Sequence, residues 1–136
     1  MVSETNAAVI AEFRANRGEV AAPYANPPPM LLVHTTGHKS GREHITPMRA
    51  RVEGDAWYVY ASVHGSERDP DWFRNLVANP EIAIEVGAGT IPVRATVLGG
   101  EERDRVFAAH AADFPVFAEY QARLRRTIPV VRLDRR

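Results

Sequence analysis

Short runs of alternating side chains, separated by glycine or proline turns, fill much of this chain and restrict it to a fold rich in β-strands. In the clearest run, Ile82, Ile84 and Val86 alternate with smaller or charged residues. A turn of Gly87-Ala88-Gly89 follows, and the return run alternates through Val97. A period of two around a short glycine turn predicts a β-hairpin with one buried face. Further strands are expected at Met30–Thr36, Glu43–Val52, Ala56–Ser62 and Ile128–Leu133.

Two of these strands have features that restrict their place in a sheet. Met30–Thr36 begins with consecutive apolar residues, which is typical of a strand buried on both faces. Glu43–Val52 alternates along its whole length and is expected to be one strand. It contains Pro47, which has no N–H to donate, so this residue predicts a sheet edge or a bulge.

Four helices are expected around the strands. The first spans Ser3–Arg17 and the second ends at Ala78, while the last two begin at Gly100 and Pro115. In the second helix Asp69 is the expected N-cap and Pro70 the first helical residue. Its buried side is expected to carry Trp72, Phe73, Leu76 and Val77. In the third helix His110 is expected to be a packing residue with its polar atoms satisfied.

Many short antiparallel strands with helices inserted late favour a small β-barrel with peripheral helices, a mainly β (α+β) fold. The length of 136 residues suits a single domain spanning 1–136. Residues 1–29 would form an N-terminal helix and a proline-rich linker, and residues 30–136 the barrel.

Charge and composition exclude several classes of partner. Seventeen basic and seventeen acidic residues cancel, so nothing predicts binding to nucleic acid. The chain has no cysteine, and its clustered histidines lack the spacing of a metal site, so no metal is expected. No apolar run approaches the roughly 20 residues of a membrane span and no signal peptide is visible, which favours a cytoplasmic protein without an integral membrane segment.

The segment from Thr35 to Pro47 joins the first two strands and includes the end of one and the start of the other. Its residues are unusual for a turn. Gly37 and Gly41 bracket a His-Lys-Ser sequence, and Lys39 is the only lysine in the chain. Glycines let backbone N–H groups converge on an anion, and lysine and hydroxyl groups add donors, so this tip could hold a phosphate. A solvated surface turn accounts for the same residues. Nearby aromatic residues could form the apolar walls of a cofactor site or simply belong to the core.

Several motifs, in one order and spacing, carry a family resemblance. Thr35–Gly41 followed by Thr46-Pro47 resembles the T-T-G-R-K-S-G…T-P signature of deazaflavin-dependent nitroreductases. Asp69–Glu81 is similar to the H-P-D-W-Y-x-N-L-x-A-N-P motif of the same family. Weaker matches continue to the end of the chain, at residues 100–105, 120–121 and 126–131. A series of motifs is far more specific than one short pattern.

The resemblance implies a split β-barrel related to flavin-nucleotide oxidases, and coenzyme F-420 as the cofactor. A reduced deazaflavin would pass a hydride to a quinone, a nitro compound or a similar electrophile. By position in the motifs, the resemblance implies cofactor binding by His38, Lys39, Ser40, Arg42, His44, Thr46, Pro47, Met48, Ala61, Ser62, Trp72 and Asn75. It implies a substrate side formed by Phe117 and Tyr120, with Tyr120 and Ser62 as the catalytic residues.

The chain departs from the family motif at His38 and His44, where the family usually has arginine. Arg42 lies in the same loop and is expected to supply the missing charge. Alternatives are the same barrel holding FMN, or a non-catalytic protein that binds a cofactor or a lipid. The expected partner is a small-molecule substrate, while a homodimer and a peripheral contact with a membrane are left open.

Overall fold

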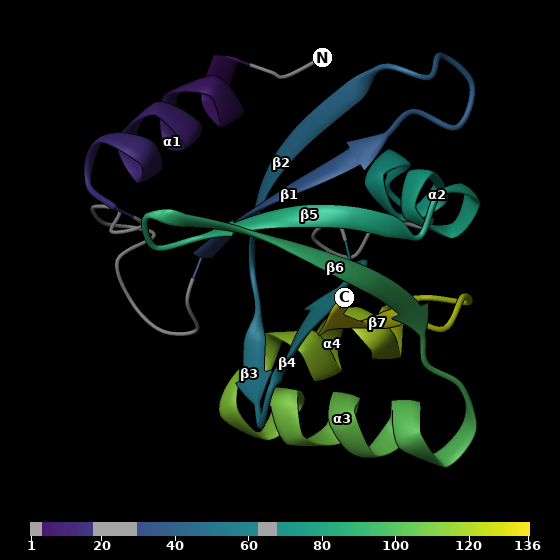
Figure 1. Cartoon of the computed structure of the whole chain (residues 1–136). Coiled ribbons are helices and arrows are strands. Elements are labelled where there is room, and N and C mark those ends of the chain that lie inside the picture. The colour runs from purple at the N-terminus through teal and green to yellow at the C-terminus, as the bar shows by residue number, and fades with distance from the viewer. Residues whose placement is uncertain (1–3, 18–29, 63–67) are drawn as a thin grey trace.

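A strongly curled antiparallel sheet of seven strands forms the centre of the computed structural model (Figure 1). The structure describes residues 4–17, 30–62 and 68–136, so the expected proline-rich linker, the Ser3 end of the first helix and most of the loop after Ser62 lie outside the described residues. The strands are β1 Met30–Thr36, β2 Glu43–Arg49, β3 Arg51–Glu53, β4 Ala56–Tyr60, β5 Glu81–Val86, β6 Gly89–Val97 and β7 Val130–Arg135. The helices are α1 Glu4–Ala15, α2 Asp71–Ala78, α3 Gly100–Asp113 and α4 Val116–Arg123.

The sheet is curled because one continuous stretch of chain forms the strands at both of its ends. The strand order is β2-β1-β5-β6-β7-β4-β3, so β2 and β3 lie at opposite ends although only Ala50 separates them in sequence. The single strand expected over Glu43–Val52 is therefore wrong. Its first part pairs with β1 and its last part with β4, and the small, fully buried Ala50 lies where the chain passes between them. Pro47 lies in an end strand of the sheet, as its missing N–H predicted.

The two faces of β4 pack into different apolar clusters. Trp57 and Val59 belong to the first cluster, which includes Leu76 from α2. Tyr58 and Tyr60 point to the opposite face and belong to a second cluster, which α3 and α4 cover. The strand expected to continue to Ser62 ends at Tyr60. Burial on both faces explains why this short strand contains so few polar residues.

Helix α1 packs on the face of β1 opposite to the first cluster. Ile10 and Phe13 contact Met30 and Leu32 in a third apolar cluster, and Phe13 is only 1% exposed. Burying a side chain of this size stabilises the fold by about 1.5–3 kcal/mol. These contacts dock α1 on the core.

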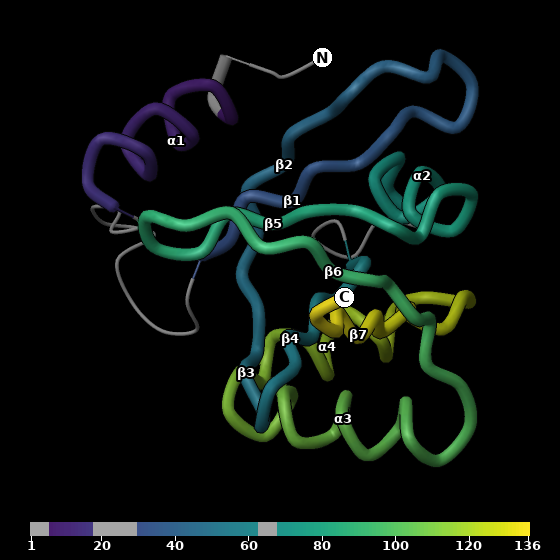
Figure 2. The backbone as a smooth tube through the Cα atoms, viewed as in Figure 1, coloured from purple at the N-terminus to yellow at the C-terminus, as the bar shows by residue number. Residues whose placement is uncertain are grey.

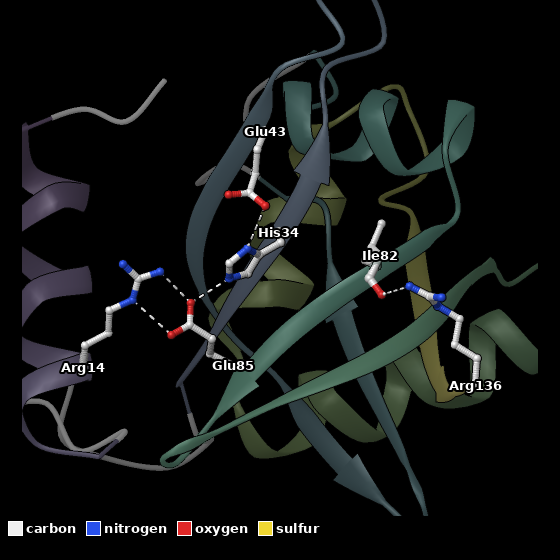
Figure 3. Close-up of polar contacts among 6 residues, drawn as sticks. All are labelled: Arg14, His34, Glu43, Ile82, Glu85 and Arg136. Carbon is white, nitrogen blue, oxygen red and sulfur yellow. Dashed lines mark hydrogen bonds and ion pairs between the residues drawn. The ribbon is translucent and has the colours of Figure 1, made fainter.

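An ionic contact adds to this docking. Arg14 of α1 donates two hydrogen bonds to the carboxylate of Glu85 on β5, at 3.0 and 2.7 Å (Figure 3). Nε2 of His34 lies 2.6 Å from the same carboxylate, and Nδ1 of His34 lies 3.3 Å from Glu43. The hydrogen bonds from Arg14 are the main reason that the pKa of Glu85 lies below its usual value. Figure 3 also shows Arg136 donating to the carbonyl of Ile82 at 3.0 Å.

Helix α2 begins one residue later than expected. Asp71 is its first residue and Pro70 its N-cap, without a side-chain capping bond. Asp69 does not cap the helix, because its carboxylate accepts a hydrogen bond from Arg126 at 2.9 Å. Val77 was placed on the buried side and is 55% exposed, whereas Leu76 is 1% exposed. The backbone trace in Figure 2 shows that α2 lies beside the tip of the β1–β2 hairpin.

Among the described residues, no helix is both long enough and apolar enough to cross a lipid bilayer.

Candidate functional site

A cleft of about 390 Å³ lies between the tip of the β1–β2 hairpin and helix α2. We call it the hairpin cleft. One wall comes from the hairpin and the other from the helix, so residues more than thirty positions apart in sequence meet here. Its lining residues are Gly37, His38, Lys39, Ser40, His44 and Thr46 from the hairpin, and Asp71, Trp72, Arg74 and Asn75 from the helix.

The hairpin tip is a compact loop held by backbone hydrogen bonds. The N–H of Gly37 donates to the carbonyl of Arg42 at 2.7 Å, and the N–H of Gly41 donates to the carbonyl of Gly37 at 2.9 Å. Gly41 has φ of 71°, in the left-handed region that suits glycine. The Oγ of Ser40 accepts a hydrogen bond from the N–H of Arg42 at 3.2 Å.

Gly37 is buried beneath the side chains of the loop. A Cβ at this position would lie 2.4 Å from Oγ of Ser40 and 3.0 Å from Nε2 of His44. Both distances are shorter than ordinary contacts between carbon and these atoms. A side chain at position 37 would therefore force those of Ser40 and His44 to move away from the backbone.

Asn75 joins the two walls of the hairpin cleft. Its side-chain oxygen accepts the backbone N–H of His38 at 3.0 Å and lies 2.7 Å from Nδ1 of the same residue. Asn75 is 4% exposed, and its amide nitrogen lies 3.5 Å from Oγ1 of Thr35. The helix therefore fixes both the backbone and the ring of His38.

The charge of the hairpin cleft is mixed, with a positive excess. Lys39 and Arg74 carry permanent positive charges, and Asp71 is the one carboxylate among the lining residues. His38 and His44 add two imidazole rings. Such a set of donors is suited to phosphate or carboxylate groups.

Seven of the cofactor residues predicted from the sequence line the hairpin cleft: His38, Lys39, Ser40, His44, Thr46, Trp72 and Asn75. Gly37, which the sequence placed in the phosphate-binding tip, also lines it, and so do Asp71 and Arg74, which were missed. Helical spacing held a signal for these two, because Asp71 lies four residues before Asn75 and three before Arg74, and residues at these spacings are neighbours on a helix.

The other predicted cofactor residues do not line this cleft: Arg42, Pro47, Met48, Ala61 and Ser62. Arg42 is exposed, and Met48 packs against the first apolar cluster. Ser62 is 8% exposed, and its carbonyl accepts a hydrogen bond from Arg126 at 3.1 Å. Since Arg126 also binds Asp69, it connects the end of β4 with the start of α2.

Phe117 and Tyr120, expected on the substrate side, lie in the second apolar cluster. Their ring centroids are 5.8 Å apart in an edge-to-face arrangement, and Phe117 also contacts His110 at 4.5 Å. Both residues are half-buried on α4. The sequence-based roles of these two residues remain predictions.

The same cluster contains an unusual pair of polar side chains. The rings of Tyr60 and His110 are stacked, with centroids 4.0 Å apart. Among the described residues, neither the hydroxyl of Tyr60 nor Nδ1 of His110 has a hydrogen-bond partner, although both atoms are buried. His110 was expected to be a satisfied packing residue, and only the packing is correct. Burial lowers the pKa of His110 to about 4 and raises the pKa of Tyr60 far above its ordinary value, so both are neutral near pH 7.

Comparison with known proteins points to one class of enzyme. The family model described as F420H(2)-dependent quinone reductase matches residues 6–134. A relative named "F420H(2)-dependent quinone reductase" from Mycobacterium tuberculosis is 35% identical over 127 residues, which cover 91% of this chain and 85% of that protein.

Two solved structures are similar over most of the chain. One, described as an F420-H2 dependent reductase, is 34% identical with a TM-score of 0.71, and covers 78% of this chain and 94% of its own. The other, described as a domain-swapped dimer, is 30% identical with a TM-score of 0.73, and covers 97% of this chain and 100% of its own. Together with the curled sheet, these matches confirm the split β-barrel expected from the motifs.

Proposed function

The chain belongs to the F420H(2)-dependent quinone reductase family, and from this we propose that it reduces quinones, nitro compounds or similar electrophiles with a hydride from reduced coenzyme F-420. The family is one of oxidoreductases, and F-420 is its cofactor. The observation that carries the proposal to this chain is the hairpin cleft, because it combines the motif residues from two distant segments in one site.

The residues of the hairpin cleft fit the anionic part of such a cofactor. Lys39 supplies a permanent charge, and Ser40 supplies a hydroxyl beside it. His38 and Asn75 hold the loop in place against α2. The side chain of Trp72, which is half-buried at the start of α2, offers an apolar surface next to these donors. The proposed role of these residues is to bind the phosphate and the acidic tail and to orient the rest of the cofactor.

When bound, the reduced deazaflavin supplies a hydride to the acceptor, and one proton from another source completes a quinol. We assign this proton to the phenol of Tyr120, with Phe117 beside it as an apolar wall for the acceptor. Ala61 and Ser62, which follow β4, and Pro47 and Met48 of β2 are proposed to border the ring. The protein's contribution is to position the two reactants and to exclude water.

A homodimer is the proposed assembly, since a related structure with 30% identity is described as a domain-swapped dimer. A cytoplasmic location, expected from the sequence, stays a prediction.

Parallel titrations with F-420, FMN and FAD test the cofactor. We expect the purified protein to bind F-420 and to oxidise its reduced form when a quinone is added. Lys39→Ala is expected to weaken F-420 binding strongly, whereas Arg94→Ala, at an exposed residue paired with Glu81, serves as the matched control. Tight binding of FMN without binding of F-420 would contradict the proposal. Binding of F-420 without turnover across quinones and nitroaromatic compounds would instead indicate a non-catalytic binding protein.

A further inference from the structure

The family motif usually has arginine at the positions of His38 and His44. Two other arginines, Arg42 and Arg74, are candidates to supply the permanent positive charge that these histidines do not provide. Arg42 lies in the hairpin loop itself, and sequence alone favours it. Its side chain is exposed, and it does not line the hairpin cleft. Arg74, one turn into α2, does line the cleft and lies on the wall opposite to Lys39.

The side chain of Arg74 is held only weakly by the protein. Its Nη1 lies 3.8 Å from Oδ1 of Asp71, which is beyond hydrogen-bond distance. The Arg74 side chain is 40% exposed and that of Asp71 is 88% exposed. Exposed ion pairs of this kind contribute little to stability, because solvent screens them. Arg74 can therefore turn from Asp71 to an anion in the cleft without disturbing the fold.

Another arginine near the start of α2 is engaged elsewhere. Arg126, close to the start of α2, donates to Asp69 and to the carbonyl of Ser62. Arg74 thus combines a planar guanidinium, a loose partner and a position in the cleft. A guanidinium can donate two parallel hydrogen bonds to one phosphate or carboxylate, which an imidazole cannot do.

We infer that Arg74, and not Arg42, is the residue that makes the hairpin cleft specific for an anionic cofactor, by binding the phosphate or acidic tail opposite Lys39. This inference rests on the proposed function. Asp71 is the carboxylate that lies beside Arg74 in the free protein, and it opposes anion binding by its own charge. The pair therefore sets how strongly the site distinguishes a charged cofactor from a neutral one.

The test compares two ligands with the same ring system: F-420, and the ribityl deazaflavin that lacks the phosphate and the tail. Fluorescence titrations would be made with the wild type and with Arg74→Gln, Arg74→Lys, Arg42→Gln, Asp71→Asn and the distant control Arg94→Gln. Arg74→Gln is expected to weaken the affinity for F-420 by roughly tenfold or more and to change the affinity for the ribityl deazaflavin by less than about twofold. The affinity of Arg74→Lys for F-420 should lie between those of the wild type and Arg74→Gln, because lysine keeps the charge but lacks the planar guanidinium.

Asp71→Asn is expected to strengthen F-420 binding, and Arg42→Gln is expected to behave like Arg94→Gln. Equal effects of Arg74→Gln and Arg42→Gln on F-420 binding would overturn the inference, as would an equal loss of affinity for both ligands. Thermal unfolding of each variant shows whether a loss comes from unfolding. If the wild type binds F-420 and Arg74→Gln binds it equally well, this inference alone fails. If the wild type binds neither ligand, both this inference and the proposed function fail.

Discussion

Nδ1 of His38 lies 2.7 Å from the side-chain oxygen of Asn75, and this contact determines which nitrogen of the imidazole carries the proton. The backbone N–H of His38 donates to the same oxygen at 3.0 Å. A backbone N–H can only donate, so the orientation of the Asn75 amide is fixed, and Nδ1 must donate as well. In the neutral ring Nε2 is then an acceptor, and it becomes a donor to an anion only when the ring is charged.

The first prediction follows for the tautomer of His38. Two-bond ¹⁵N–¹H correlation spectra at a pH where the ring is neutral should show the Nδ1–H form in the wild type. Asn75→Ala removes the acceptor, and the ring of His38 should then shift toward the Nε2–H form. The same variant is expected to lose about 1–3 kcal/mol of stability, because it leaves the N–H of His38 without its partner.

Asn75→Asp is the matched variant for this experiment, because it keeps an oxygen acceptor of the same size. It should retain the Nδ1–H arrangement and show less loss of stability than Asn75→Ala. An Nε2–H form in the wild type would show that Asn75 does not hold the ring as the structure describes.

The second prediction concerns the close contacts above Gly37. Gly37→Ala places a methyl group 2.4 Å from Oγ of Ser40 and 3.0 Å from Nε2 of His44, so the loop has to shift. We expect a loss of about 1–3 kcal/mol of stability, measured by urea unfolding, and weaker binding of F-420. Gly89→Ala is the control, since its added Cβ would meet the carbonyl oxygen of Val86 at an ordinary 3.9 Å and its φ is not positive.

The double variant Gly37→Ala with Ser40→Ala separates the two contacts. It removes the shorter contact, so part of the lost stability should return, while the contact with His44 remains. A single variant Gly37→Ala as stable as Gly89→Ala would mean that the loop has room that the structure does not show.

The strands could be predicted from sequence because alternation is a local property of the chain. The expectation failed at Ala50, where nothing local distinguishes one long strand from two short ones. The break is imposed by the partners, because the residues before Ala50 pair with β1 and those after it pair with β4 at the other end of the sheet. Tertiary pairing of this kind leaves no mark on the sequence pattern itself.

In the site, too, contiguous motifs could be found from the sequence, whereas residues that meet only in the folded chain could not. The motif residues of the hairpin and of α2 were found because each motif is contiguous. Arg74 was missed, because sequence proximity favoured Arg42, which lies in the loop but does not line the cleft. The direction of a loop side chain depends on the turn geometry, whereas helical spacing leads from Asn75 back four residues to Asp71, and from Asp71 forward three residues to Arg74.

The third prediction concerns the ionic contact that holds α1. Glu85 accepts two hydrogen bonds from Arg14, and its side chain is 15% exposed. Glu85→Gln should therefore lower the free energy of unfolding at pH 7 by about 1–3 kcal/mol. Glu81→Gln is the control at an exposed pair with Arg94, where about 0–1 kcal/mol is expected.

The pH dependence of this contact has a definite sign. The pKa of Glu85 lies below its ordinary value of 4.5, so the carboxylate stabilises the fold above that pH and the contribution is lost as pH falls through the lowered pKa. The difference in stability between the wild type and Glu85→Gln should thus be full at pH 7 and should shrink in strong acid. A difference that stays constant across this range would show that the charge of Glu85 is not what holds α1.

The last prediction uses the buried pair of Tyr60 and His110. Burial lowers the pKa of His110 from 6.5 to about 4, so between these values the unfolded chain binds a proton that the folded chain does not. Stability should therefore fall as pH decreases from 7 to 5, by about 2 kcal/mol from this residue. Urea unfolding at several pH values measures the slope, and in His110→Phe the slope over this window should flatten. Tyr60→Phe removes the other unpartnered polar atom but no group that titrates in this range, so it should leave the slope unchanged. An unchanged slope in His110→Phe would mean that folding does not lower the pKa of this histidine, and that its ring is not excluded from solvent as the structure describes.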